Sequence, residues 1–201
     1  MAAGPHLPRS LNEDSAEIMT EAPLKPSPDI KAQNSLDPKA LRACCGQFAT
    51  GVTVVTTRTE EGDHGMTVSA FMSVSLDPPL IGVCVGARST LLARVRHAGR
   101  FAVSVLAQDM EAHAMHFAGR RNDALQDLFE PHDGLPVLKG AGAVFTTDLV
   151  QQVTTGDHVI LIGQVCSMAH DKAARPLLHH AGQFKSIASP DSCSPERQHR
   201  A

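Results

Sequence analysis

The chain has 201 residues, of which 42% are hydrophobic and 19% charged, and its formal net charge is −3 at pH 7. A chain of this length can bury one good core. Lys and Arg are spread along the chain rather than gathered in a stripe, so we expect no nucleic-acid partner. No apolar run approaches the ~20 residues that span a bilayer, and the N-terminus lacks a basic-then-apolar signal pattern. These features predict a cytoplasmic protein with no membrane contact.

Proline and polar residues dominate both ends of the chain. The first 35 residues contain five prolines and no sustained apolar period, which predicts a disordered tail over residues 1–35. Residues 188–201 are polar and contain Pro190 and Pro195, which predicts a flexible C-terminal tail. One domain over residues 36–187 remains.

The cysteines and histidines form no pattern for a metal or redox centre. Five cysteines are present, Cys44 and Cys45 are adjacent, and no C-x-x-C pair occurs, so we expect reduced, buried thiols. Among the eleven histidines, His113 and His116 are three residues apart on a predicted helix. No Cys or carboxylate completes a ligand set at the required spacing, so we expect no metal.

The first predicted element is a helix. Asp37 supplies an N-cap acceptor, and Pro38 follows at the position where a missing N–H costs nothing. Apolar residues then recur at helical spacing and predict a face that packs on the core: Leu41, Cys44, Cys45 and Phe48.

Strands are predicted next, at residues 52–57, 66–75 and 80–85, with a turn over residues 62–65 between the first two. The second strand ends where Pro78 and Pro79 remove consecutive backbone donors.

The second half of the chain alternates short helices with strands. A helix begins at Ser89 and Thr90 and ends before Gly99, which we expect to supply a left-handed cap. Asp109 is expected to cap a third helix that runs to Phe117 and stops at Gly119. The further predicted elements are strands at 101–106, 143–149 and 159–168 and a loop over residues 131–136. Six strands with short helices between them favour a mainly β fold, an antiparallel Greek-key barrel, over alternating βαβ units.

Ser, Thr, Ala and Gly at exposed strand positions would let a planar ligand lie close to the main chain. Residues 46–57 and 67–79 combine such positions, and in order and spacing they resemble the flavin reductase-like family, the FMN-binding split barrels that serve as reductase partners of two-component monooxygenases. The resemblance continues, in order, through residues 79–86, 88–90, 99–106, 134–141, 156–158 and 176–178.

The resemblance implies a six-stranded FMN-binding split barrel and an NAD(P)H-dependent flavin reductase. Hydride would pass from NADH or NADPH to FMN, or to FAD, and the reduced flavin would go to a separate oxygenase component. The family also implies a homodimer. Sequence leaves open which flavin and which nucleotide are used, and whether the flavin is a substrate or a retained cofactor.

The flavin-binding residues implied by the family lie on two strand segments and one helix. The alternative is that the strand residues are ordinary residues of a solvated face and that the helix residues belong to the core. The implied contacts are Thr67, Val68, Ser69, Ala70, Cys84, Val85, Gly86, His116 and Phe117.

The segment Arg88, Ser89 and Thr90 has chemistry that does not depend on the resemblance. A helix that begins with Ser and Thr presents free N–H groups, hydroxyls and the positive end of its dipole, and Arg88 adds a cationic fork. We interpret this segment as the FMN phosphate site. The alternative is a plain N-cap beside an exposed arginine.

Asp157 and His158 match the family's Gly-Asp-His turn, which implies a place beside the nicotinamide. Hydride transfer needs no proton abstraction from carbon, so His158, the candidate catalytic residue, is expected to position the nicotinamide rather than act as a base. A turn histidine without a role is the alternative. His180 and Gln183 could contact the dinucleotide, but histidines stand where the family normally has aromatic residues before a small turn.

Two other functions are compatible with this fold. One is a flavoprotein that holds FMN as an electron carrier or store without nicotinamide chemistry, and His158 in its motif favours the enzyme over it. The other is a relative of the pyridoxamine-phosphate oxidases, which should show a basic cluster for a second phosphate that the sequence lacks.

Overall fold

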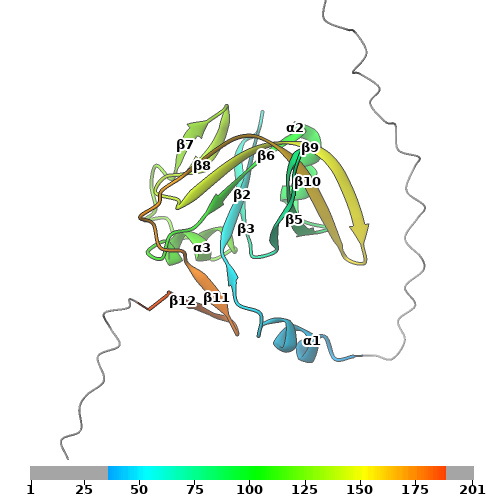
Figure 1. Cartoon of the computed structure of the whole chain (residues 1–201), viewed down its shortest axis with the longest axis vertical. Helices are drawn as coiled ribbons and strands as arrows, with labels where there is room; N and C mark the ends of the chain where they lie inside the picture. Colours follow the sequence, from blue (N-terminus) through cyan, green and yellow to red (C-terminus); the bar gives the residue numbers. More distant parts are fainter. Residues whose placement is uncertain (1–35, 189–201) are drawn as a thin grey trace, which may run out of the picture. The chain divides into compact units, whose positions relative to one another are not determined.

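The computed structural model describes residues 36–188 (Figure 1). The predicted tail over 1–35 and all but the first residue of the tail over 188–201 lie outside this range. The helices are α1 (Pro38–Cys45), α2 (Thr90–Ala98) and α3 (Glu111–Phe117). The strands are β1 (Thr50–Gly51), β2 (Thr53–Thr59), β3 (Gly62–Val68), β4 (Phe71–Leu76), β5 (Pro79–Gly86), β6 (Arg100–Val105), β7 (Phe129–His132), β8 (Leu135–Leu138), β9 (Ala143–Thr155), β10 (His158–His170), β11 (Leu178–His180) and β12 (Gln183–Lys185).

Within the described residues, seven strands form one antiparallel sheet in the order β3-β2-β6-β9-β10-β5-β4. The sheet curves, as Figure 1 shows, and brings β3 and β5 into contact. Its inner face holds a core of Val, Leu, Ile and Phe side chains, which Leu91, Leu92 and Val95 of α2 complete. The predicted class, mainly β with short α-helices, is confirmed.

A second apolar cluster lies where α3 packs beside the sheet. Ala114 of α3 is fully buried there with Leu106, Leu138 and Leu177. The cluster fixes the position of α3 relative to β2 and β3, and the candidate site forms along that border. No helix between residues 36 and 188 has the length and apolar character needed to cross a membrane.

The helix caps confirm several local predictions. The Asp37 carboxylate accepts the N–H of Lys39 at 3.0 Å, and the Ser89 hydroxyl accepts the N–H of Leu92 at 3.3 Å. Gly99 ends α2 in the left-handed conformation, with φ 69°. These caps depend on neighbouring residues alone, which is why the sequence predicted them. The third helix differs, because its N-cap is Met110 and not Asp109.

The first strands are arranged differently from the prediction. The turn between β2 and β3 lies at Glu60 and Glu61, and Gly62 and Gly65 belong to β3. The predicted strand over 66–75 is two strands, β3 and β4, because the chain changes partner between them. β3 pairs with β2, whereas β4 pairs with β5. This division accounts for seven strands in the main sheet where the sequence predicted six.

The predicted loop over 131–136 is instead the hairpin of β7 and β8, in which Pro131 lies opposite Pro136. Strands β9 and β10 also extend beyond the predicted 143–149 and 159–168 and pair along nearly their full length. Local patterns underestimated these strands because the outer ends of β9 and β10 carry mixed polar residues.

The prediction that α1 packs on the core was wrong. None of the α1 residues is buried, and Leu41 and Phe48 are 55% and 79% exposed. The predicted burial of the thiols was also wrong: Cys44, Cys45 and Cys166 are exposed and Cys84 is half-buried. These four cysteines are free.

At Gly163 the backbone of β10 lies so close to the side chains of Thr147 on β9 and Phe101 on β6 that no side chain fits there. A Cβ at this position would lie 2.6 Å from Phe101 Cζ and 2.6 Å from Thr147 Oγ1. The approach sets the distance between the middle of β10 and the core phenylalanine.

We therefore predict that Gly163→Ala lowers the free energy of unfolding by about 1–3 kcal/mol, the usual cost of overpacking. Gly51→Ala is the matched control, because a Cβ at Gly51 would meet no atom within 4 Å. Chemical denaturation of the two variants measures the difference. Equal stabilities would mean that the core adjusts around the new methyl group.

Candidate functional site

The site begins where β5 ends and α2 starts. His158 is the register partner of Gly86, and the Ala87 N–H donates to Asp157 O at 2.9 Å. This pairing brings the Gly-Asp-His turn against the start of α2. A pocket of about 420 Å³ lies between them and is lined by Gly86, Ala87, Arg88, Ser89, Asp157 and His158.

The His158 ring is oriented by its neighbour. His158 Nδ1 and Asp157 Oδ1 are 2.7 Å apart, and since an ionised carboxylate can only accept, Nδ1 carries the proton. The hydrogen bond to His158 holds the pKa of Asp157 below its usual value, and the charges of His158 and Arg88 act in the same direction. The imidazole is half exposed, so Nε2 is the ring atom that a ligand can meet.

The start of α2 is compatible both with a plain N-cap and with a phosphate site. The Ser89 side chain is an N-cap, as the plain interpretation holds. Thr90 is the first helical residue and is exposed, and so is Arg88. Because Ser89 satisfies one of the N–H groups of the first turn, the others and the Thr90 hydroxyl remain the donors suited to an anion.

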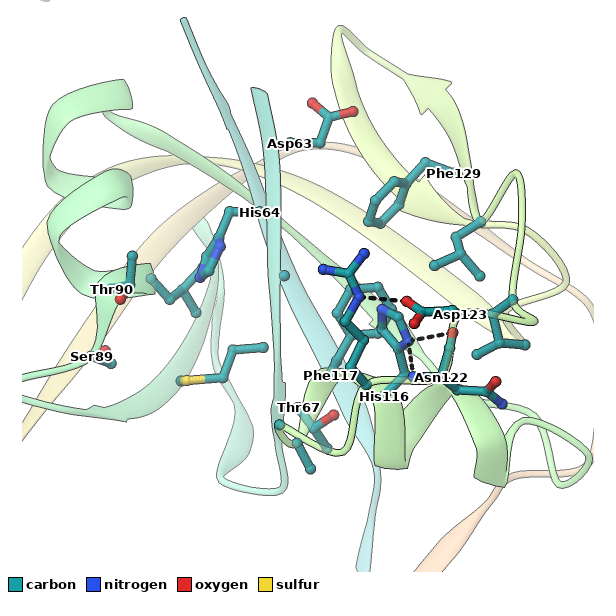
Figure 2. A pocket seen from close by; sticks show the side chains of 18 of the residues that line it. Asp63, His64, Thr67, Ser89, Thr90, His116, Phe117, Asn122, Asp123 and Phe129 are labelled. Atoms are coloured by element: carbon teal, nitrogen blue, oxygen red, sulfur yellow. Dashed lines mark hydrogen bonds and ion pairs between the residues drawn. The ribbon is translucent and has the colours of Figure 1, made fainter. Parts of the chain in front are cut away.

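A larger pocket of about 1280 Å³ lies between β3, the start of α2, and α3 with the loop that follows it (Figure 2). The structure thus places together residues from three separate predicted motifs. Those that line this pocket are Thr67, Arg88, Ser89, Thr90, His116 and Phe117.

Thr67 links the strand and helix sides of this pocket. Its hydroxyl donates to Ala114 O at 2.7 Å, so it ties β3 to α3. Ser69 lies on the other side of α3, in a neighbouring pocket of about 650 Å³ that Gln183 also lines. His180 is half-buried on β11, where it pairs with Gln183 of β12, and is not among the lining residues of either pocket.

At the remaining predicted flavin contacts, the backbone is better placed than the side chain to meet a flavin. Val68 and Val85 have their side chains in the core. Ala70 is exposed, and its carbonyl oxygen accepts the Cys84 N–H at 3.0 Å. Burial, with the charge of Asp157, raises the pKa of the Cys84 thiol, which makes it a poor nucleophile at neutral pH.

Several lining residues were missed by the sequence analysis. His64 and Met66 lie on β3, an edge strand whose consecutive residues border the pocket. Burial, with the charge of Arg94, lowers the pKa of His64 and keeps its ring neutral at pH 7. Further missed residues come from the loop after α3 and the start of β7, and no local pattern marks them; they include Asn122, Leu125, Gln126, Leu128 and Phe129.

His116 holds that loop in place. Its Nδ1 lies 3.0 Å from the Asn122 backbone nitrogen and accepts that N–H. The ring also meets Phe117 edge-on, with centroids 4.9 Å apart. Among residues 36–188, no three His, Cys, Asp or Glu side chains are grouped so that they could hold a metal ion.

The comparison with protein families decides what kind of site this is. The model of the flavin reductase like domain matches residues 45–188. The chain belongs to this family. An NADH-dependent flavin reductase of Rhodococcus sp. is 38% identical over 159 residues, which cover 76% of this chain and 90% of that protein. The reductase component of a 4-hydroxyphenylacetate 3-monooxygenase from Thermus thermophilus is 36% identical and covers 76% of this chain and 98% of its own length.

Solved structures agree with the sequence relatives. The flavin reductase PheA2 in its native state superposes with a TM-score of 0.74 at 38% identity, over 77% of this chain and 100% of that one. Membership confirms the resemblance found in the sequence, and with it the split-barrel class and the oxidoreductase class.

Arg88→Ala should weaken the binding of FMN but leave riboflavin unchanged, because riboflavin lacks the phosphate. A charge-assisted hydrogen bond of about 1.5–3 kcal/mol corresponds to a loss of roughly ten- to a hundredfold in FMN affinity. Fluorescence titration of both ligands measures it, and Arg96→Ala, at the other end of α2, is the matched control. Equal weakening of FMN and riboflavin would place the phosphate elsewhere.

Proposed function

We propose that this protein is an NADH-dependent flavin reductase that transfers hydride to FMN or FAD and supplies the reduced flavin to a separate monooxygenase component. The observation that carries the proposal is the register of β10 on β5. This register brings the Asp157–His158 turn beside the start of α2, which supports a nicotinamide site next to a phosphate site.

The residues of the site fit a flavin mononucleotide. The first turn of α2, with Arg88 and Thr90, offers donors and positive charge for a phosphate. Thr67 and the main chain around Ser69 and Ala70 border the space beside it. A bound flavin supplies the hydride acceptor of the reaction.

The chain's own contribution is binding and orientation. His158, with its tautomer set by Asp157, is suited to hold the nicotinamide or its carboxamide against the flavin face. Backbone N–H groups at the pocket edge would stabilise the negative charge that a bound flavin gains when it is reduced, as in an oxyanion hole. Holding the nicotinamide in this way does not require His158 to exchange a proton.

The Rhodococcus relative is named for NADH, which makes NADH the nucleotide we propose here. The use of NADH also fits the cytoplasmic location expected from the sequence. Gln183 and His180, on the short hairpin of β11 and β12, remain the residues proposed to contact the dinucleotide.

We also propose that the protein is a homodimer. Strand β4 presents Met72, Val74 and Leu76, which are 43%, 44% and 93% exposed. An edge strand with such a row of apolar side chains is typical of a surface that a second copy covers. Leu41 and Phe48, exposed in and after α1, add further apolar surface of the same kind.

The reductase proposal predicts that NADH oxidation by dialysed protein rises and saturates as free FMN or FAD is added. Steady-state absorbance at 340 nm and anaerobic stopped-flow measure this. A protein that stays yellow after dialysis and whose rate ignores added flavin would be a retained-flavin carrier instead. No NADH oxidation with either flavin would contradict the proposal outright.

His158→Ala should raise the KM for NADH by about tenfold and change kcat by less than about threefold, if the ring binds ground state and transition state alike. His170→Ala, at the far end of the same strand, is the control. A thousandfold fall in kcat with an unchanged KM would instead assign His158 a role in the chemical step.

A further inference from the structure

His64 is a titratable side chain that β3 directs toward the start of α2. Side chains alternate along a strand, so His64, Met66 and Val68 lie on the same face of β3. Val68 is buried in the core of the sheet, and Met66 packs against that core. Figure 2 shows the imidazole directed toward Ser89 and Thr90. The ring therefore borders the space that the proposed phosphate would occupy.

The His64 ring is half-buried, and it makes no hydrogen bond to another residue of the described range 36–188. Its register partner on β2, Thr57, is uncharged. Burial, with the charge of Arg94, lowers the pKa of His64, so the ring is neutral at pH 7. An imidazole whose nitrogens meet no partner in the fold can hydrogen-bond a ligand in the pocket.

Positive charge surrounds His64 on the side of α2. Arg88 lines the same pocket just before the first turn of this helix, where unpaired backbone N–H groups carry the positive end of the helix dipole. Arg94, one turn further along α2, is ion-paired with Glu61 at 2.7 Å. Positive charge of this kind opposes protonation of the ring.

The two carboxylates that line the pocket are already paired with arginines. Asp63 on β3 forms a bidentate pair with Arg58, at 2.7 and 3.0 Å. On the side of α3, Asp123 is paired with Arg121 at 2.6 Å, and His116 accepts a backbone N–H of the following loop. A bound anion would therefore be the group that compensates a positive charge on the imidazole.

We propose that His64 is a further ligand of the FMN phosphate and takes up a proton when FMN binds. A phosphate monoester carries about two negative charges at neutral pH, which reverses the sign of the charge beside the ring. One proton then passes from the solvent to the unprotonated ring nitrogen, and the imidazolium donates an N–H to a phosphate oxygen. The inference rests on the proposed function, because it adds a residue to the same phosphate site.

Proton uptake makes the affinity for FMN depend on pH. His64 is neutral in the free protein at pH 7 and charged in the complex, so binding consumes a proton between the pKa of the free protein and that of the complex. The affinity therefore increases as the pH falls toward the lower pKa, and it decreases as the pH rises through the higher one. Riboflavin lacks the phosphate and should show neither effect.

Calorimetric titration of dialysed full-length protein with FMN counts the protons, when it is repeated in two phosphate-free buffers of different ionisation enthalpy. At about pH 7.5 we expect roughly 0.3–1 proton to be taken up per FMN, and none per riboflavin. Fluorescence titration gives the affinities. The unaltered protein should bind FMN at least about threefold more tightly at about pH 6.5 than at about pH 8.5.

Two variants separate the proton from the shape of the side chain. His64→Gln keeps hydrogen-bonding groups but cannot gain a charge, so we expect no proton uptake and an FMN affinity that stays within about twofold across this pH range. His64→Arg is always charged, so we expect no proton uptake and tighter FMN binding than in His64→Gln at high pH. His97→Gln, exposed in the last turn of α2 and outside the lining of this pocket, is the matched control.

Absence of proton uptake by the unaltered protein would overturn the inference, and so would an equal uptake in His64→Gln. Proton uptake with NADH alone and not with FMN would assign His64 to the dinucleotide and overturn it as well. Failure of the proposed function gives a different result, because the protein would then bind no flavin and oxidise no NADH, and the inference would fail with it.

Discussion

Strand β10 is hydrogen-bonded along both edges, to β9 on one side and to β5 on the other. Antiparallel pairing on two sides leaves a strand no freedom to slip, because a shift of one residue would turn Val159 and Leu161 out of the core. The register therefore fixes the turn at Asp157 against the end of β5. Every contact proposed between nicotinamide and flavin sites depends on this one alignment.

The border of the site formed by β3 and α3 is held by side-chain packing rather than by strand pairing on both edges. Among the described strands, β3 is paired with β2 alone, and α3 lies beside it through the Thr67 hydroxyl and the buried Ala114. The candidate site thus combines the β10–β5 side, which is fixed by strand pairing on both edges of β10, with the β3–α3 side, which is fixed by packing. Such an arrangement combines a rigid reaction centre with a border that loops can reshape.

The parts of the site that could be predicted are those with local chemistry. Ser89 and Gly99 were found because a cap is decided by two or three neighbouring residues, whereas Thr67 was implied by the family resemblance of residues 67–79. The β7–β8 hairpin was missed because Pro131 and Pro136 argue against strands, although they face each other where each can be accommodated. The periodicity of α1 predicted a face packed on the core, but Leu41 is 55% exposed, because a local pattern does not show whether a partner surface is present.

The loop after α3 shows most clearly where sequence reasoning ends. Asn122, Leu125 and Phe129 share no sequence pattern. They reach the pocket because His116 and the second apolar cluster hold the chain there. Residues that are held in place by tertiary hydrogen bonds show no periodic pattern in the sequence. The family comparison identified the reaction class, whereas the extent of the pocket came from the structure alone.

Gly65 contributes to this pocket by having no side chain. The space that a Cβ would need is already taken by the ring of Phe117, so the two positions share one volume. Their substitutions cannot be independent: a larger residue at 65 requires a smaller one at 117, and the energetic effects of changing both will not add. In a protein that diverges by single changes, neither position can change in size alone without cost, so the Phe117 ring keeps its place for as long as β3 keeps Gly65.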